Sequence, residues 1–144
     1  MEHASMVHAL REIHRTLKSN GILIDLRPVE DNWSVEVHSA SGLQIAGYLT
    51  DVPIGKADDE AAFAAMRDVE SRGWFIRERE DEFAFFYYWD TPSEMKEWMD
   101  QEWDDFVKME NDVYRKAQSL WASANADARV RVRVKMLITR WKST

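Results

Sequence analysis

The stretch from Arg129 to Trp141 constrains the fold more than any other part of the chain. Residues 129–135 alternate strictly between cations and valine, so a β-strand places four cations on one face and three valines on the other. Such a strand needs an apolar layer against its valines, and acids or water against its cations. We therefore expect it inside a sheet, paired with the acidic residues Glu78, Glu80 and Glu82.

Charge is spread unevenly over the 144 residues, whose net charge is −7. Residues 129–144 hold six basic side chains and no acid, whereas residues 58–112 hold 18 acids against six bases. The basic end either forms a nucleic-acid surface or pairs internally with the acidic middle. Because the overall negative charge repels phosphate at long range, we expect internal pairing and no nucleic-acid partner.

The composition is typical of a globular protein, and the length fits a single domain over 1–144. The absence of cysteine excludes disulfides, thiol catalysis and zinc–thiolate sites. No apolar run reaches the ~18–20 residues of a membrane span, and the N-terminus lacks the pattern of a signal peptide. We expect a cytoplasmic protein with no membrane partner.

Apolar spacing predicts helices alternating with strands. Helices are expected at 5–19, 59–72 and 93–124, with a bend near Asp104 that makes two helices of the last. Strands are expected at 22–27, 74–90 and 129–141, with a hairpin at 33–49. The fold class is therefore α/β (α+β), a small mixed β-sheet of four to six strands packed with three or four helices.

Local signals add detail to these elements. Asn20-Gly21 and Gly73 are helix stops, and Thr91-Pro92-Ser93-Glu94 combines a capping box with proline at the first helical position. The continuous apolar run at 22–24 indicates a strand buried on both faces, as in a parallel sheet. Residues 50–57 are expected to form a loop, and the aromatic run at 83–89 to be largely buried.

Residues 9–25, ALREIHRTLKSNGILID, join an amphipathic helix, an Asn-Gly break and an apolar strand. This segment resembles the one that leads into the fifth strand of class I S-adenosylmethionine-dependent methyltransferases. There a Leu-x-Glu-Ile-x-Arg-x-Leu-Lys-Pro-Gly-Gly pattern precedes the strand. The matching positions are Leu10, Glu12, Ile13, Arg15, Leu17, Lys18 and Gly21. Ser19 and Asn20 stand where the family has Pro and Gly.

The resemblance implies the C-terminal half of a Rossmann-like methyltransferase fold: a helix, a sixth strand, further helices and a seventh strand antiparallel to its neighbours. The family holds its cofactor in the other half, on a Gly-rich turn. This chain would begin after strand four, and its five glycines form no G-x-G cluster. The implied protein is a truncated methyltransferase-like domain with the cofactor-binding half missing. It would meet S-adenosylmethionine only if a partner supplied that half.

The resemblance also has a consequence for association. In the family, strand five pairs with strand four on one side and strand seven on the other. Without strand four, residues 22–26 present an open apolar edge, which templates association. Either the 33–49 hairpin or a second copy must cover it, and we expect a homodimer.

No catalytic, cofactor-binding or metal-ligating residue is assigned. Five residues are candidates for a ligand site or an interface. Asp25 and Arg27 end the apolar strand, where open α/β sheets bind ligands, or they form a structural ion pair. Trp33, Tyr87 and Trp89 line an apolar ligand pocket, or they belong to a core or an interface.

Two classes of function follow. The first is a methyltransferase-like domain without independent catalysis, which acts by self-association or by binding a protein partner. The second is a small-molecule-binding module with an aromatic pocket. A variant of the first is the C-terminal half of a methyltransferase that another chain completes.

Overall fold

The computed structural model describes residues 2–144, which form four helices and seven strands of an α+β fold. The predicted fold class is confirmed. The chain divides into two compact units. Unit 1 takes the residues up to Val29 together with 56–83 and 136–144, and unit 2 takes 30–55 and 84–135. The expectation of a single domain stays a prediction.

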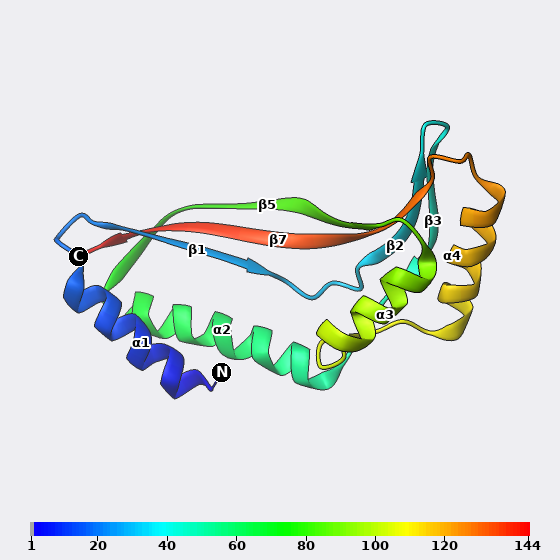
Figure 1. Cartoon of the computed structure of the whole chain (residues 1–144). Helices are drawn as coiled ribbons and strands as arrows, with labels where there is room; N and C mark the ends of the chain where they lie inside the picture. Colours follow the sequence, from blue (N-terminus) through cyan, green and yellow to red (C-terminus); the bar gives the residue numbers. More distant parts are fainter. Residues whose placement is uncertain (1) are drawn as a thin grey trace. The chain divides into compact units, whose positions relative to one another are not determined.

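Unit 1 is built on three strands and two helices. Strand β1 (Ile22–Pro28) runs antiparallel to β7 (Arg129–Ser143), from Ile22 opposite Lys142 to Pro28 opposite Met136. Strand β5 (Phe75–Trp89) also pairs with β7. Figure 1 shows the red β7 between β1 and β5, with α1 (His3–Thr16) and α2 (Pro53–Ser71) both on one side of these strands.

The core of unit 1 forms between the helices and this sheet. Its buried centre consists of Met66, Val69, Phe75 and Trp141. Partly buried Val7, Leu10, Leu17, Leu23 and Trp74 pack against that centre. The i, i+3, i+4 spacing of the apolar residues turns one stripe of each helix toward the strands. Side chains alternate between the two faces of β1 and β7, and those on one face pack against the apolar stripes of the helices.

The predicted helix stops are confirmed. Helix α1 ends at Thr16, and Asn20 then adopts a left-handed φ of 66°. Helix α2 ends at Ser71, and Gly73 follows with φ 73°. The predicted start of α2 was wrong, because residues 53–57 are helical and do not form a loop. Proline at the first helical position costs no hydrogen bond, so Pro53 opens the helix six residues earlier than expected.

The expected burial of β1 on both faces is wrong. Leu23, Asp25 and Arg27 are half-buried, whereas Ile22, Ile24 and Leu26 are exposed. The strand lies at the end of the sheet, pairs antiparallel with β7, and is covered on one face. A short apolar run does not distinguish a strand buried on both faces from an edge strand with a bare face.

Unit 2 contains the predicted hairpin, β2 (Ser34–Ser39) and β3 (Gly42–Tyr48). Strand β2 lies between β3 and residues 129–133 of β7. The alternation in β7 is confirmed, since Val130, Val132 and Val134 are buried. A second sheet joins β4 (Thr50–Asp51) to β6 (Val107–Lys108).

The long helical pattern at 93–124 forms two helices, α3 (Pro92–Glu102) and α4 (Asn111–Ser123). Strand β6 separates them in place of the expected bend. The capping signal is confirmed, since the Glu94 amide donates to Thr91 Oγ1 at 3.2 Å. The aromatic run of β5 is only partly buried, because Phe83, Phe85 and Tyr88 are exposed. Among the described residues, no helix is long and apolar enough to cross a membrane.

Candidate functional site

The cations of β7 pair with acids inside each unit. In unit 2, Arg129 contacts Asp90 at 3.2 Å and Lys135 contacts Asp31 at 3.4 Å. In unit 1, Arg140 contacts Glu78 at 2.8 Å, as expected. Glu80 instead accepts a hydrogen bond from Thr139 Oγ1 at 3.0 Å. The repulsion among like charges along β7 is thus offset by acids drawn from several elements.

Arg131 and Glu36 form the most buried of these ion pairs, with 12% and 3% of their side chains exposed. Arg131 Nε donates to Glu36 Oε1 at 2.7 Å, and Arg131 Nη1 donates to the Tyr88 hydroxyl at 2.9 Å. Desolvation acts to lower the pKa of Arg131, but the hydrogen bonds to Tyr88 and Glu36 outweigh it and raise that pKa. Glu36 and Arg131 are directly opposite each other in the pairing of β2 with β7, so the ion pair joins these two strands.

The candidate aromatic residues Trp33, Tyr87 and Trp89 meet in unit 2, together with Trp98 and Trp103 of the α3 region. Ring centroids lie 5.3 Å apart for Trp33 and Trp103, and 5.0 Å apart for Tyr87 and Trp103. These edge-to-face distances are those of packed aromatic pairs. The three residues therefore belong to one packed aromatic cluster, in which Trp33 and Trp103 are buried and Tyr87 and Trp89 are half-buried.

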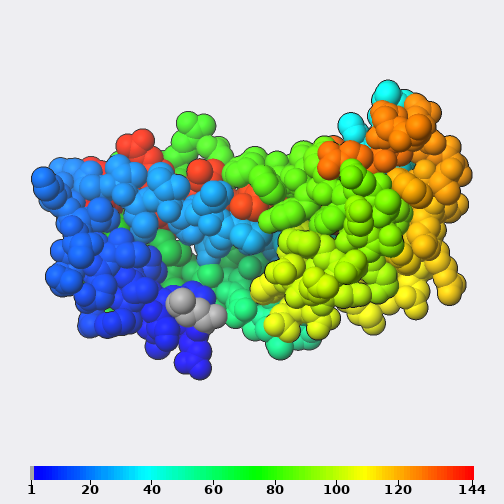
Figure 2. All heavy atoms as spheres, in the orientation of Figure 1, coloured from blue at the N-terminus to red at the C-terminus, as the bar shows by residue number. Residues whose placement is uncertain are grey.

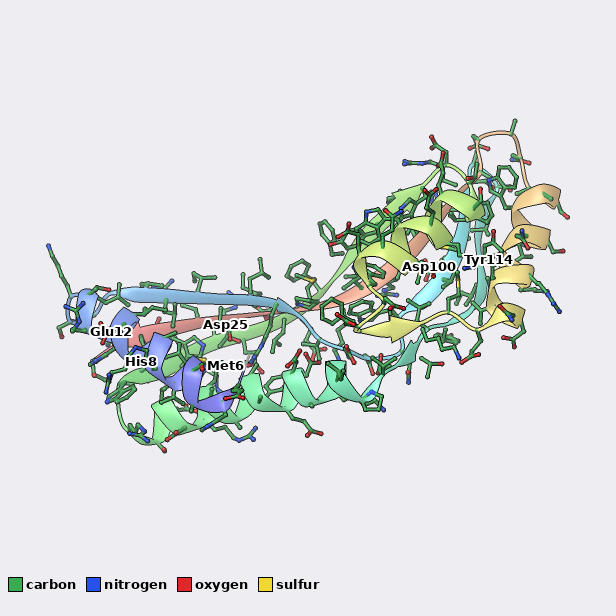
Figure 3. The ribbon with its side chains drawn as sticks, turned by 60° about the horizontal axis from the view of Figure 1, so that its bottom comes forward. Met6, His8, Glu12, Asp25, Asp100 and Tyr114 are labelled. Carbon is green, nitrogen blue, oxygen red and sulfur yellow. The ribbon has the colours of Figure 1, made fainter. Side chains whose placement is uncertain are left out.

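The candidate residues Asp25 and Arg27 lie together in unit 1, at a groove between α1 and α2. The cavity measures about 290 Å³. Apart from Asp25 and Arg27, its lining is apolar: Met6, Ala9, Leu10, Ile13, Ala62, Ala65 and Met66. Figure 3 labels Met6 on α1 and Asp25 on β1, which line this groove from facing elements.

Asp25 and Arg27 form the ion pair that was weighed as one interpretation, with 3.6 Å between Arg27 Nη2 and Asp25 Oδ2. The Arg27 guanidinium also lies over the Phe63 ring, 4.3 Å from its centroid. The Arg27 Nε is buried and has no hydrogen-bond partner among the described residues. An ion pair at this distance leaves most of the five donors of the guanidinium unused.

Burial raises the pKa of Asp25, and the nearby Glu80 adds to this effect, while Arg27 opposes it. A raised pKa in the folded state means that ionisation of Asp25 removes stability as pH rises past the ordinary value of about 3.9. The unfolding free energy of Asp25→Asn, relative to that of the unmodified chain, should therefore increase as the pH rises from 4 to 7. Urea unfolding of both proteins at several pH values measures this difference, and a difference that stays constant or falls with pH contradicts it.

Sequence reasoning missed the walls of the groove. They come from the apolar stripe of α1 and from Ala62, Ala65 and Met66 of α2, whose spacing predicted the helices but not a cavity between them. The short side chains at Ala62 and Ala65 cannot fill the space between α1, α2 and β1. The alanines of α2, which face Asp25 and Arg27, were the only signal in the sequence for this cavity.

The exposed face of β1 is the other prominent feature of unit 1. Ile22, Ile24 and Leu26 are 40%, 53% and 54% exposed. Figure 2 shows the medium-blue atoms of β1 at the surface of unit 1, above the darker α1. Natural edge strands usually carry a charge or a proline within such a face to block further pairing. Here the two charged side chains of β1, Asp25 and Arg27, belong to the opposite face, and the exposed face carries only Pro28, at the very end of the strand.

No group of acidic and histidine side chains that could hold a metal ion occurs within residues 2–144. Comparison of the chain with protein-family models, with curated proteins and with solved structures finds no match.

Proposed function

We propose that this chain is a truncated methyltransferase-like domain that acts by self-association through β1 and has no independent catalysis. The exposed aliphatic face and free edge of β1 carry the proposal. A strand of this kind exposes unpaired backbone groups beside apolar side chains, and a further strand satisfies both.

The order of elements in unit 1 supports the resemblance to the closing half of that fold. Helix α1, strand β1, helix α2 and strand β5 follow one another, and β7 comes last. Strand β7 pairs with β1 in antiparallel sense and with β5 on its other side. The resemblance implies this order. It also places the family's final strand, which corresponds to β7, beside the family's strand five, which corresponds to β1.

The hairpin does not cover β1, which leaves the second copy as the occupant we propose. The hairpin strand β2 pairs with residues 129–133 of β7, and no described strand other than β7 pairs with β1. The opposite end of the sheet, β3, is a poorer template. Its pairing with β2 shifts register between Val35 and Glu36, and such bulges twist an edge away from further pairing.

A second β1 is also chemically suited to the first. A two-fold axis through the edge sets β1 antiparallel to its own copy. Because side chains alternate along both strands, a register centred on Ile24 places the exposed aliphatic residues of the two copies on the same face. Apolar contact across that face removes surface from water on both chains at about 25 cal/mol per Å².

Light scattering coupled to size exclusion tests the association. At micromolar concentration we expect a molar mass twice the 16.9 kDa of the chain. A strict monomer over this range contradicts the proposal.

Isothermal titration with S-adenosylmethionine tests the second half of the proposal, the lack of independent catalysis. The chain alone should release no binding heat, because its glycines form no cradle for a nucleotide. Binding by the chain alone contradicts the proposal. Binding only in a mixture with another chain identifies the variant in which a partner completes the site. The cytoplasmic location stays a prediction.

A further inference from the structure

We propose that the groove between α1 and α2 binds an aliphatic monocarboxylate, with the carboxylate on Arg27 and the hydrocarbon tail between the helices. This site goes beyond the proposed function. It lies on the covered face of β1, whereas self-association uses the exposed face.

The polar end of the groove offers a cation with unused donors. Arg27 and Asp25 are only 17% and 21% exposed as side chains. Their ion pair engages Nη2 at 3.6 Å, and the buried Nε has no hydrogen-bond partner among the described residues. A guanidinium presents a fork of donors that fits a carboxylate, so Arg27 can donate to a second carboxylate besides that of Asp25, and Nε is a donor without a partner within residues 2–144.

The Phe63 ring holds this cation in place. It lies 4.3 Å from the Arg27 guanidinium carbon and covers one face of the planar group. A cation stacked on an aromatic face keeps its hydrogen-bonding edges free, because the donors lie in the plane of the guanidinium. Arg27 therefore combines a fixed orientation with donors available at its edge.

The rest of the groove selects the tail of the ligand. Its walls are the side chains of Met6, Leu10, Ile13 and Met66, with the alanines of α1 and α2 leaving the space between them. A volume of about 290 Å³ is at the lower end of the range for small-molecule pockets. Flexible methionine side chains adapt to an unbranched chain. These features favour a medium-length aliphatic tail over a bulky or polar group.

Titration calorimetry with octanoate as the probe tests this site, with octanol as the ligand that keeps the tail and lacks the charge. We expect saturable binding of octanoate at one site per chain, and a Kd for octanol at least tenfold higher. Shortening the probe by one methylene should raise the Kd about fourfold, the value for one buried CH₂. Equal affinity for octanoate and octanol, or no binding of octanoate, overturns the proposal.

Arg27→Lys tests the role of the guanidinium, because lysine keeps the charge and removes the Nε donor. The octanoate Kd should rise at least tenfold. Arg72→Lys is the matched control in the same unit. Arg72 pairs with Asp68 at 2.8 Å and lies over the Trp74 ring, but it does not line the groove. An unchanged Kd in Arg27→Lys, or an equal loss in Arg72→Lys, contradicts the assignment to Arg27.

Two further variants keep the test independent of folding and of association. Ala62→Leu should fill the groove and abolish octanoate binding, with the circular dichroism spectrum unchanged. Ile24→Lys alters the opposite face of β1, so it should bind octanoate with the Kd of the unmodified chain. Loss of binding in Ile24→Lys would show that the site needs the dimer and would contradict a groove complete within one chain.

Discussion

Replacing Ile24 with lysine should dissociate the proposed homodimer. Ile24 is 53% exposed on the bare face of β1, and a two-fold pairing places two copies of the substitution in one interface. Each copy loses the apolar contact of Ile24 across the two-fold axis, and the two new lysines lie opposite each other and beside Arg140, the register partner of Ile24. The lost contact and the like-charge repulsion together correspond to an increase of at least about tenfold in the dissociation constant. Sedimentation velocity over a concentration series measures it.

Ile45→Lys is the control for this experiment. Ile45 lies on β3, another edge strand of the same sheet, and it is 49% exposed, so the two substitutions change hydrophobicity and charge alike. The Ile45→Lys protein should remain a dimer with an unchanged dissociation constant. Dissociation by Ile45→Lys together with a dimeric Ile24→Lys would assign the interface to β3 and refute the account.

Replacing Glu36 with alanine should destabilise the fold by about 3 kcal/mol, at the lower end of the range for breaking a buried ion pair. The substitution leaves the Arg131 guanidinium in a site where only 12% of its side chain reaches water. The Tyr88 hydroxyl at 2.9 Å and the Phe86 ring at 4.1 Å remain as partners, which keeps the loss from being larger. Urea unfolding at fixed protein concentration measures the change in unfolding free energy.

Glu78→Ala provides the matched comparison, because Glu78 pairs with Arg140 of the same strand β7 at nearly the same distance. Its pair is open to water, so the loss should stay below about 1 kcal/mol. The double variant Glu36→Met/Arg131→Met should recover most of the stability lost in Glu36→Ala, since neither charge is then left unpaired. Equal losses in Glu36→Ala and Glu78→Ala would show that burial does not set the contribution of these pairs.

Much of the fold could be predicted where a local pattern has one physical solution. The alternation at 129–135 admits a strand and little else, and Val130, Val132 and Val134 are buried as expected. The Asn20-Gly21 break and the Thr91 cap depend on neighbouring residues alone, so both were found. The start of α2 was missed because residues 50–57 were expected to form a loop, although proline is favourable in a first helical turn and Pro53 begins the helix.

The candidate sites were harder to predict because they depend on which faces the fold leaves uncovered. Whether Ile24 is core or surface is decided by the neighbours of β1 in the sheet, and the apolar run itself is the same in either case. Asp25 and Arg27 were candidates because they lie at the end of a strand, but the cavity beside them arises from the small side chains of α2. The aromatic candidates Trp33, Tyr87 and Trp89 proved to lie close together in one packed cluster.

The proposed pairing of β1 with its own copy is tested most directly by hydrogen exchange. In an antiparallel edge strand, alternate amides point away from the neighbouring strand and exchange with solvent. As protein concentration passes through the dissociation constant, those amides of β1 should become protected, while the amides at the free edge of β3 keep their rates. Protection at β3 instead, or no change in β1 between the lowest and highest concentrations, would contradict the account.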